Sequence, residues 1–122
     1  EETFKLLKLE SKVAIANGKG DEALVVLEQI IEKNPLDGEA LLLAGAFYAQ
    51  NGDQEKAVFR FEMASKVQGF QADAWLEHAK ILVRNQDYTK AIEILRKAQK
   101  SKPRDNVQKY LEAIQRVASA AN

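Results

Sequence analysis

The sequence predicts an all-α protein in which three helical hairpins stack in a row and a final helix covers one end. Three observations support this prediction. The sequence repeats with a period of 34 residues and without insertion, over residues 4–37, 38–71 and 72–105. Within each half of a copy, apolar residues recur at spacings of three and four, as on one face of a helix. Between the two halves stands a short stretch rich in asparagine, glycine and aspartate, which favours a turn.

The second copy shows this pattern most clearly. The stripe of its first helix consists of Leu41, Ala44, Gly45 and Tyr48. The turn Asn51-Gly52-Asp53 follows, because glycine permits positive φ and Asp53 can cap the next helix. A second helix is predicted over about residues 54–67, and its inward face carries Ala57, Phe61 and Ala64.

The other two copies keep the same register. The equivalent positions of the third copy are Trp75, His78, Ala79, Leu82, Ala91, Leu95, Ala98 and Pro103. Those of the first copy are Leu7, Glu10, Ser11, Ala14, Ala23, Leu27, Ile30 and Pro35. Their turns are Asn85-Gln86-Asp87 and Asn17-Gly18-Lys19-Gly20. We therefore expect helix, turn and helix in every copy, with the first helix of the first copy departing most from the pattern.

A seventh helix is predicted over about residues 105–119, of which we assign 106–119 to a cap. Its apolar face consists of Val107, Tyr110, Leu111, Ile114 and Val117. The other faces are polar, so this helix is expected to cover the last hairpin. No such helix precedes the first copy. Because the chain starts at Glu1 and enters the helical pattern at once, we expect that it was cut from a longer protein or lost a leader, and that an upstream repeat could pack there.

Composition excludes several classes of function. Lysine plus arginine balances aspartate plus glutamate at 18 each, so no net field attracts nucleic acid or an anionic membrane. The absence of cysteine excludes disulfides and zinc–thiolate sites. The longest apolar run, residues 40–49, is too short to span a membrane. We expect a soluble protein, and both the cytoplasm and the periplasm remain open.

On these residues the chain resembles the tetratricopeptide repeat family. The matching positions are Ala23, Pro35, Gly45, Tyr48, Ala57, Phe61, Ala64, Trp75, Ala91, Ala98 and Pro103. The departures are Gly69 for the final proline, Ser11 and Ala79 for glycine, and Glu10 and His78 for leucine. We expect these departures to weaken local packing without changing the fold. The resemblance implies a right-handed superhelical solenoid whose first helices line a concave groove for a peptide or helix of a partner.

Projection of the sequence onto that groove selects fourteen residues from the three first helices. They are Lys5, Lys8, Lys12, Glu39, Leu42, Leu43, Ala46, Ala49, Asp73, Leu76, Glu77, Lys80, Val83 and Arg84. The expected groove is basic at one end, apolar in the middle and mixed beyond. It suits an amphipathic helix or an extended segment that buries apolar side chains on Leu42, Ala46 and Leu76 and points an acidic end toward the three lysines.

The best-known binding mode of the family holds the C-terminal carboxylate of heat-shock chaperones with cationic and amide side chains. Only Lys8 matches the five positions of that clamp. The other four positions hold Lys12, Leu43, Asp73 and Glu77. Two of these are carboxylates that would repel the bound terminus, so the sequence disfavours this mode.

No catalytic, cofactor or metal site is predicted. His78 is the only histidine and lies on the helix stripe, where packing between helices is the simpler interpretation. No motif places a nucleophile beside it. The runs Gly18-Lys19-Gly20 and Asn51-Gly52-Asp53 lack the spacing of a phosphate-binding loop or a calcium loop, and we interpret both as hairpin turns.

The expected function is a non-catalytic protein-interaction module with a protein or peptide ligand of unknown identity. The alternative is an assembly segment of a larger multi-repeat scaffold that associates through its convex face or its open N-terminal end. Val25 and Phe59 occupy the same repeat position on the second helices and are expected to be exposed on the convex side. We expect a monomer, and a twofold dimer through this patch is the lesser hypothesis.

Overall fold

The computed structural model describes residues 2–121, and over this range the chain forms seven helices and no strand. The helices are α1 Glu2–Ala16, α2 Gly20–Lys33, α3 Gly38–Gln50, α4 Gln54–Ala64, α5 Gln71–Arg84, α6 Tyr88–Ser101 and α7 Asp105–Ala121. Among the described helices, none combines the length and the apolar character that crossing a membrane would require.

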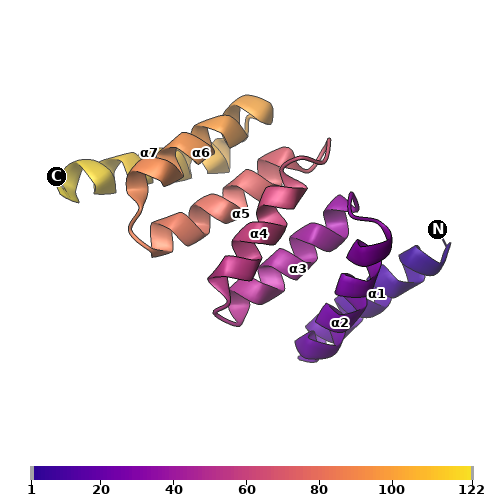
Figure 1. Ribbon diagram of the computed structural model, residues 1–122. Coiled ribbons are helices and arrows are strands. Elements are labelled where there is room, and N and C mark those ends of the chain that lie inside the picture. Colours follow the sequence, from indigo (N-terminus) through magenta and orange to yellow (C-terminus); the bar gives the residue numbers. More distant parts are fainter. Residues whose placement is uncertain (1, 122) are drawn as a thin grey trace.

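The helices pack in the order in which they follow one another along the chain. Three hairpins form from α1 with α2, α3 with α4, and α5 with α6, and each hairpin packs on the next through α2 with α3 and α4 with α5. Figure 1 shows the hairpins in a row with the two termini at opposite ends. This arrangement confirms the predicted all-α helical repeat. The first helices α3 and α5 also contact each other directly, which places them on the same side of the stack.

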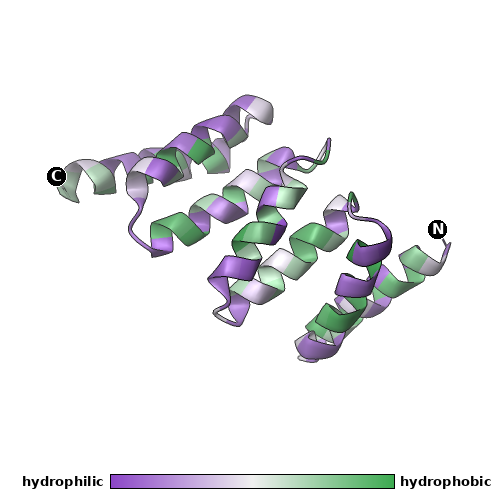
Figure 2. Cartoon of the chain, viewed as in Figure 1, coloured by the Kyte–Doolittle hydropathy of each residue, from purple (hydrophilic) through white to green (hydrophobic). Residues whose placement is uncertain are grey.

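The apolar core consists of three clusters of buried residues, which lie around α2 and α3, between α4 and α5, and among α5, α6 and α7. Figure 2 shows hydrophobic residues along most of α3, in the middle of the molecule. The cap packs on the third hairpin as predicted, and its buried side chains are Val107, Leu111 and Ile114. Val117 was expected on the same face but is exposed. The C-terminal end of α7 projects past α6 in Figure 1.

Two helix ends differ from the prediction. The second helix of the middle copy was expected to reach residue 67 but ends at Ala64. From Lys66 onward the backbone N–H groups bond to carbonyls three residues back, and Gly69 then adopts positive φ in place of the family's proline. The cap helix extends to Ala121, two residues further than expected.

The turns within the hairpins use one geometry with different residues. Gly18 and Gly52 have φ of 77° and 82°, in the region that glycine adopts without a steric cost. The third copy holds Gln86 at the equivalent position, with φ of 62°. Asp53 and Asp87 cap the helices that follow, because their side chains accept hydrogen bonds from backbone N–H groups three residues on.

Candidate functional site

The fourteen predicted groove residues lie on the first helices α1, α3 and α5, and none of them is buried. Four are exposed, namely Lys5, Lys12, Lys80 and Arg84, and the other ten are half-buried. Three of the half-buried residues pack against the core, and part of their surface remains accessible: Leu42, Leu43 and Ala49. The middle of the predicted groove is therefore partly exposed apolar surface.

The basic stripe on α1 is paired with carboxylates from the start of α3. Lys8 Nζ lies 2.7 Å from Asp37 Oδ2, and Lys12 Nζ lies 2.6 Å from Glu39 Oε2. Asp37 also caps α3, since its side chain accepts a hydrogen bond from Ala40 N. The two carboxylates offset two of the three lysine charges, which corrects the expected basic end. Among the described residues, Lys5 is the one lysine of this stripe that forms no ion pair.

A residue of the cap, Tyr110, lies near two charged residues at the far end of the predicted groove. Burial raises the pKa of Tyr110, while Arg84 lowers it and Glu77 raises it, so the phenol lies near both of these charged side chains. From the sequence, Tyr110 was expected only on the packing face of the cap helix. Its hydroxyl group was the available signal, because a tyrosine on a packing face usually directs that group toward polar surroundings.

Two further ion pairs order this far end. Lys80 Nζ lies 3.1 Å from Glu77 Oε2, one turn apart on α5. Arg104 Nη1 lies 2.9 Å from Asp73 Oδ1 and joins the loop before α7 to α5. Asp73, which stands where the carboxylate clamp needs a cation, is thus engaged within the protein.

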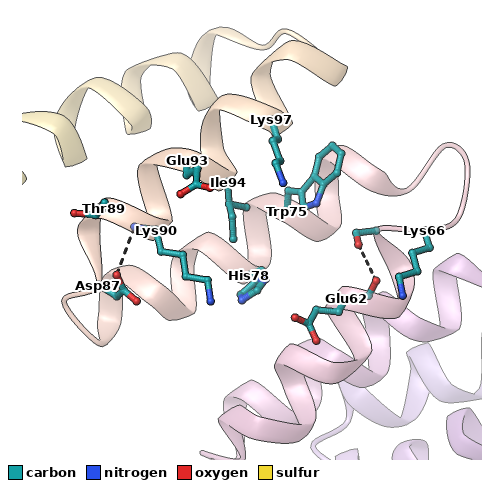
Figure 3. Close-up of a pocket in the computed structure, with 11 residues that line it drawn as sticks. Glu62, Lys66, Trp75, His78, Asp87, Thr89, Lys90, Glu93, Ile94 and Lys97 are labelled. Carbon is teal, nitrogen blue, oxygen red and sulfur yellow. Dashed lines mark hydrogen bonds between the residues drawn. The ribbon is translucent and has the colours of Figure 1, made fainter.

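A cleft of about 690 Å³ lies away from the predicted groove, between α4, α5 and α6. Figure 3 shows Trp75 and His78 of α5 between the side chains of α4 and α6. The other lining residues are Glu62, Ser65, Lys66, Asp87, Thr89, Lys90, Glu93, Ile94 and Lys97. None of the predicted groove residues lines it. Most of its lining residues come from the second helices α4 and α6, which were expected to form the convex side.

His78 is buried in this cleft, with 8% of its surface exposed. The expectation that it packs between helices is therefore met, although its ring also lines the cleft. Burial lowers the pKa of His78, Glu62 raises it and Lys90 lowers it, so the imidazole is neutral at pH 7.

The first and second hairpins are joined by a polar cluster of three side chains. Tyr48 Oη donates a hydrogen bond to Glu28 Oε2 over 3.0 Å, and Arg60 Nε donates to the same oxygen over 3.0 Å. Arg60 Nη2 bonds to Glu28 Oε1 as well, so the guanidinium holds both carboxylate oxygens. Burial and the hydrogen bond to Glu28 raise the pKa of Tyr48.

The expected convex pair is exposed, since Val25 and Phe59 both keep more than half of their surface accessible. The guanidinium carbon of Arg60 lies 5.4 Å from the centre of the Phe59 ring, within the range of a cation–π contact.

Comparison with known proteins identifies relatives of this fold. Two family models, each described as a tetratricopeptide repeat, match residues 14–72 and 72–105. A search of curated proteins finds no match to this sequence. The Sgt2 TPR domain from Aspergillus fumigatus is 25% identical, with a TM-score of 0.87 over 100% of this chain and 83% of that one.

Two other solved structures share the fold at lower identity. The first TPR of Spaghetti (RPAP3), bound to the HSP90 peptide SRMEEVD, is 14% identical with a TM-score of 0.85, and the match covers 97% of each chain. MamA is 17% identical with a TM-score of 0.74, over 97% of this chain and 80% of that one.

Proposed function

The chain belongs to the tetratricopeptide repeat family, and we propose that it is a non-catalytic module whose concave face binds a peptide or an amphipathic helix of a partner protein. The observation that carries this proposal is the partly exposed apolar surface of the first helices, at Leu42, Ala46 and Leu76. Charged side chains flank this surface at both ends. A bound segment would bury apolar side chains in the middle and satisfy polar groups at its ends.

The relatives support peptide binding but not the same peptide chemistry. The RPAP3 domain is bound to an HSP90 peptide, and that peptide ends in an acidic stretch. In this chain Lys8 is engaged by Asp37. Asp73 and Glu77 are carboxylates paired with Arg104 and Lys80, and they offer no hydrogen-bond donor to a bound carboxylate. We therefore propose a ligand anchored by apolar side chains, with an acidic group directed toward Lys5.

The double variant Leu42→Arg/Leu76→Glu is expected to abolish capture of the groove ligand. Both positions lie in the apolar middle of the groove, where a charge would remain desolvated against the bound segment. The measurement is a pull-down from cell lysate with the wild-type and variant proteins side by side, with retained proteins identified by mass spectrometry. Circular dichroism checks that both proteins are equally helical.

A matched control introduces the same two charges on the opposite side of the molecule. Val25→Arg/Phe59→Glu changes two exposed apolar residues of the second helices. This control is expected to retain the same proteins as wild type. If the groove variant retains every wild-type partner, the proposed groove is not the binding surface.

One surface favours the second candidate, an assembly role through the open face of α1. Leu6 and Val13 of α1 are 64% and 51% exposed. The residues equivalent to Val13 in the second and third copies are Phe47 and Ile81, and they are only 9% and 2% exposed. In the second and third copies this face packs against α2 and α4 of the preceding hairpin. A helix of similar shape from another chain would bury the same face of α1.

Self-association through this face is tested by light scattering at high micromolar concentration. The assembly role predicts a dimeric mass that returns to the monomeric mass in Leu6→Glu/Val13→Glu, because both introduced carboxylates would be buried in the contact. A monomeric mass for the wild-type protein would contradict self-association under these conditions.

A further inference from the structure

Within residues 2–121, the carboxylate of Glu62 lacks the hydrogen-bond partners that Glu28 has at the same position of the first copy. Glu28 stands at the same repeat position, and Arg60 and Tyr48 hold it across the first interface between hairpins. In the third copy the positions of Arg60 and Tyr48 are occupied by Ile94 and Leu82, which cannot donate hydrogen bonds. Among the described residues, Glu62 therefore lacks the hydrogen bonds that Arg60 and Tyr48 donate to Glu28.

The second interface between hairpins, which lacks the arginine and the tyrosine of the first, contains open space. Two clefts include Glu62, with volumes of about 690 and 510 Å³, whereas the cleft beside Glu28 has about 380 Å³. Lys66 and Lys90 line the larger cleft, but within residues 2–121 neither lies close enough to Glu62 to form an ion pair. Figure 3 shows the Glu62 carboxylate directed toward the space in front of His78.

His78 adds a second polar group that lacks a partner. Its counterpart in the second copy is Ala44, so the imidazole is a feature of the second interface alone. His78 as a residue is 8% exposed, and its ring makes no hydrogen bond to any residue that the structure describes. A neutral imidazole in this position offers one donor and one acceptor to whatever enters the cleft.

The charges around the cleft define what could enter it. Lys66, Lys90 and Lys97 line the walls, and in the described part of the chain none of them forms an ion pair. On the concave side, by contrast, Lys8 and Lys12 are both paired. A purely basic ligand would be repelled by the three lysines, and a purely acidic one by the three carboxylates that also line the cleft, Glu62, Asp87 and Glu93. The complementary ligand carries one cation with carboxylates on either side of it.

We infer that this cleft is a second binding site, which takes an arginine flanked by acidic residues from a segment of a partner protein. The guanidinium pairs with Glu62 as Arg60 pairs with Glu28 at the first interface. The flanking carboxylates reach the lysines of the two walls, and the apolar stem of the arginine rests on Trp75 and Ile94. Arginine fits better than lysine because its planar fork can hold both oxygens of a carboxylate.

The intrinsic fluorescence of the protein tests this inference, because Trp75 is the only tryptophan in the chain. The probe is an acetylated and amidated pentapeptide with arginine at its centre, alanine on either side and glutamate at both ends. Its comparison is the same peptide with citrulline, the neutral isostere of arginine. We expect a saturable change in Trp75 emission with the arginine peptide, and affinity weaker by about tenfold or more with citrulline or in Glu62→Gln.

Two control variants separate this site from others. Glu112→Gln removes an exposed carboxylate on α7, and Leu42→Arg alters the proposed concave groove; both are expected to bind the probe like wild type. Equal affinity for the citrulline peptide, unchanged binding by Glu62→Gln, or no saturable change up to millimolar probe would each overturn the inference. The concave-groove proposal does not depend on any of these results.

Discussion

Replacing Phe61 with alanine is expected to lower the free energy of unfolding by about 3–5 kcal/mol. The side chain is 1% exposed and lies against the backbone of α3 at Gly45, where an added Cβ would come within 2.5 Å of the ring. Removing the ring leaves a cavity between α3 and α4, because the rest of the hairpin holds the two backbones apart. Urea unfolding followed by circular dichroism measures the loss.

The control for this variant lies two residues earlier on the same helix. Phe59 is 57% exposed, so Phe59→Ala removes the same ring without creating a cavity and is expected to change the stability by about 0.5 kcal/mol or less. Similar losses for the two variants would show that α4 does not present Phe61 to α3 as described.

Leu111→Asp is expected to cost more than about 3 kcal/mol, because it replaces a buried leucine of the cap with a charge that has no partner. Leu111 packs with Leu95 and Ala91 of α6, and these residues would face water if α7 detached. In a stack of repeats the loss falls mainly on the neighbouring hairpin. Chemical unfolding reports the total cost, and limited proteolysis is expected to cleave the variant first within α7.

Asn106→Asp is the matched control, since it adds the same charge at an exposed position of the same helix. We expect its stability to remain within about 0.5 kcal/mol of wild type. If Leu111→Asp were equally stable, α7 would not act as the cap of the third hairpin.

The repeat period predicted the fold because each copy contains a complete hairpin. Apolar spacing located the helices, and the glycines at 18 and 52 located the turns that need positive φ. The third turn adopts the same geometry with Gln86, which sequence alone would not select. Neighbouring packing therefore imposes a backbone conformation that the local residue does not favour.

The small residues of the first helices show why departures from the family pattern did not loosen the core. Gly45 lies beside the large ring of Phe61, whereas Ser11 and Ala79 stand at the equivalent position in copies whose second helix carries a leucine instead. Ser11 and Ala79 are fully buried. We expected weaker packing at these positions, but a smaller partner on the facing helix compensates for the larger residue.

The ion pairs of the concave face were not predictable from spacing along the chain. Lys8 and Asp37 are almost a full repeat apart, so their contact depends on how two hairpins stack. A pattern read along one helix reveals the lysine stripe, but not the carboxylates that the next helix presents to it. The apolar middle of the groove could be predicted from the sequence, because that prediction depends only on which face of a helix each residue occupies.

The convex cleft was missed for a related reason. Trp75 and His78 lie on the stripe that packs between helices, and both were therefore expected in the core. The two interfaces between hairpins differ because Ile94 stands at the position equivalent to Arg60, and within residues 2–121 the Glu62 carboxylate forms no ion pair. Recognising this difference requires knowing that Glu28, Tyr48 and Arg60 meet in space.

The most direct test of the proposed function is a map of chemical-shift changes. A segment of a protein captured from lysate by the wild-type chain is titrated into the isotope-labelled protein, and amide shifts are followed by NMR. Binding in the concave groove predicts that the largest changes lie on α3 and α5, around Leu42, Ala46 and Leu76. Changes confined to α2, α4 and α6, or to the outer face of α1, would contradict it.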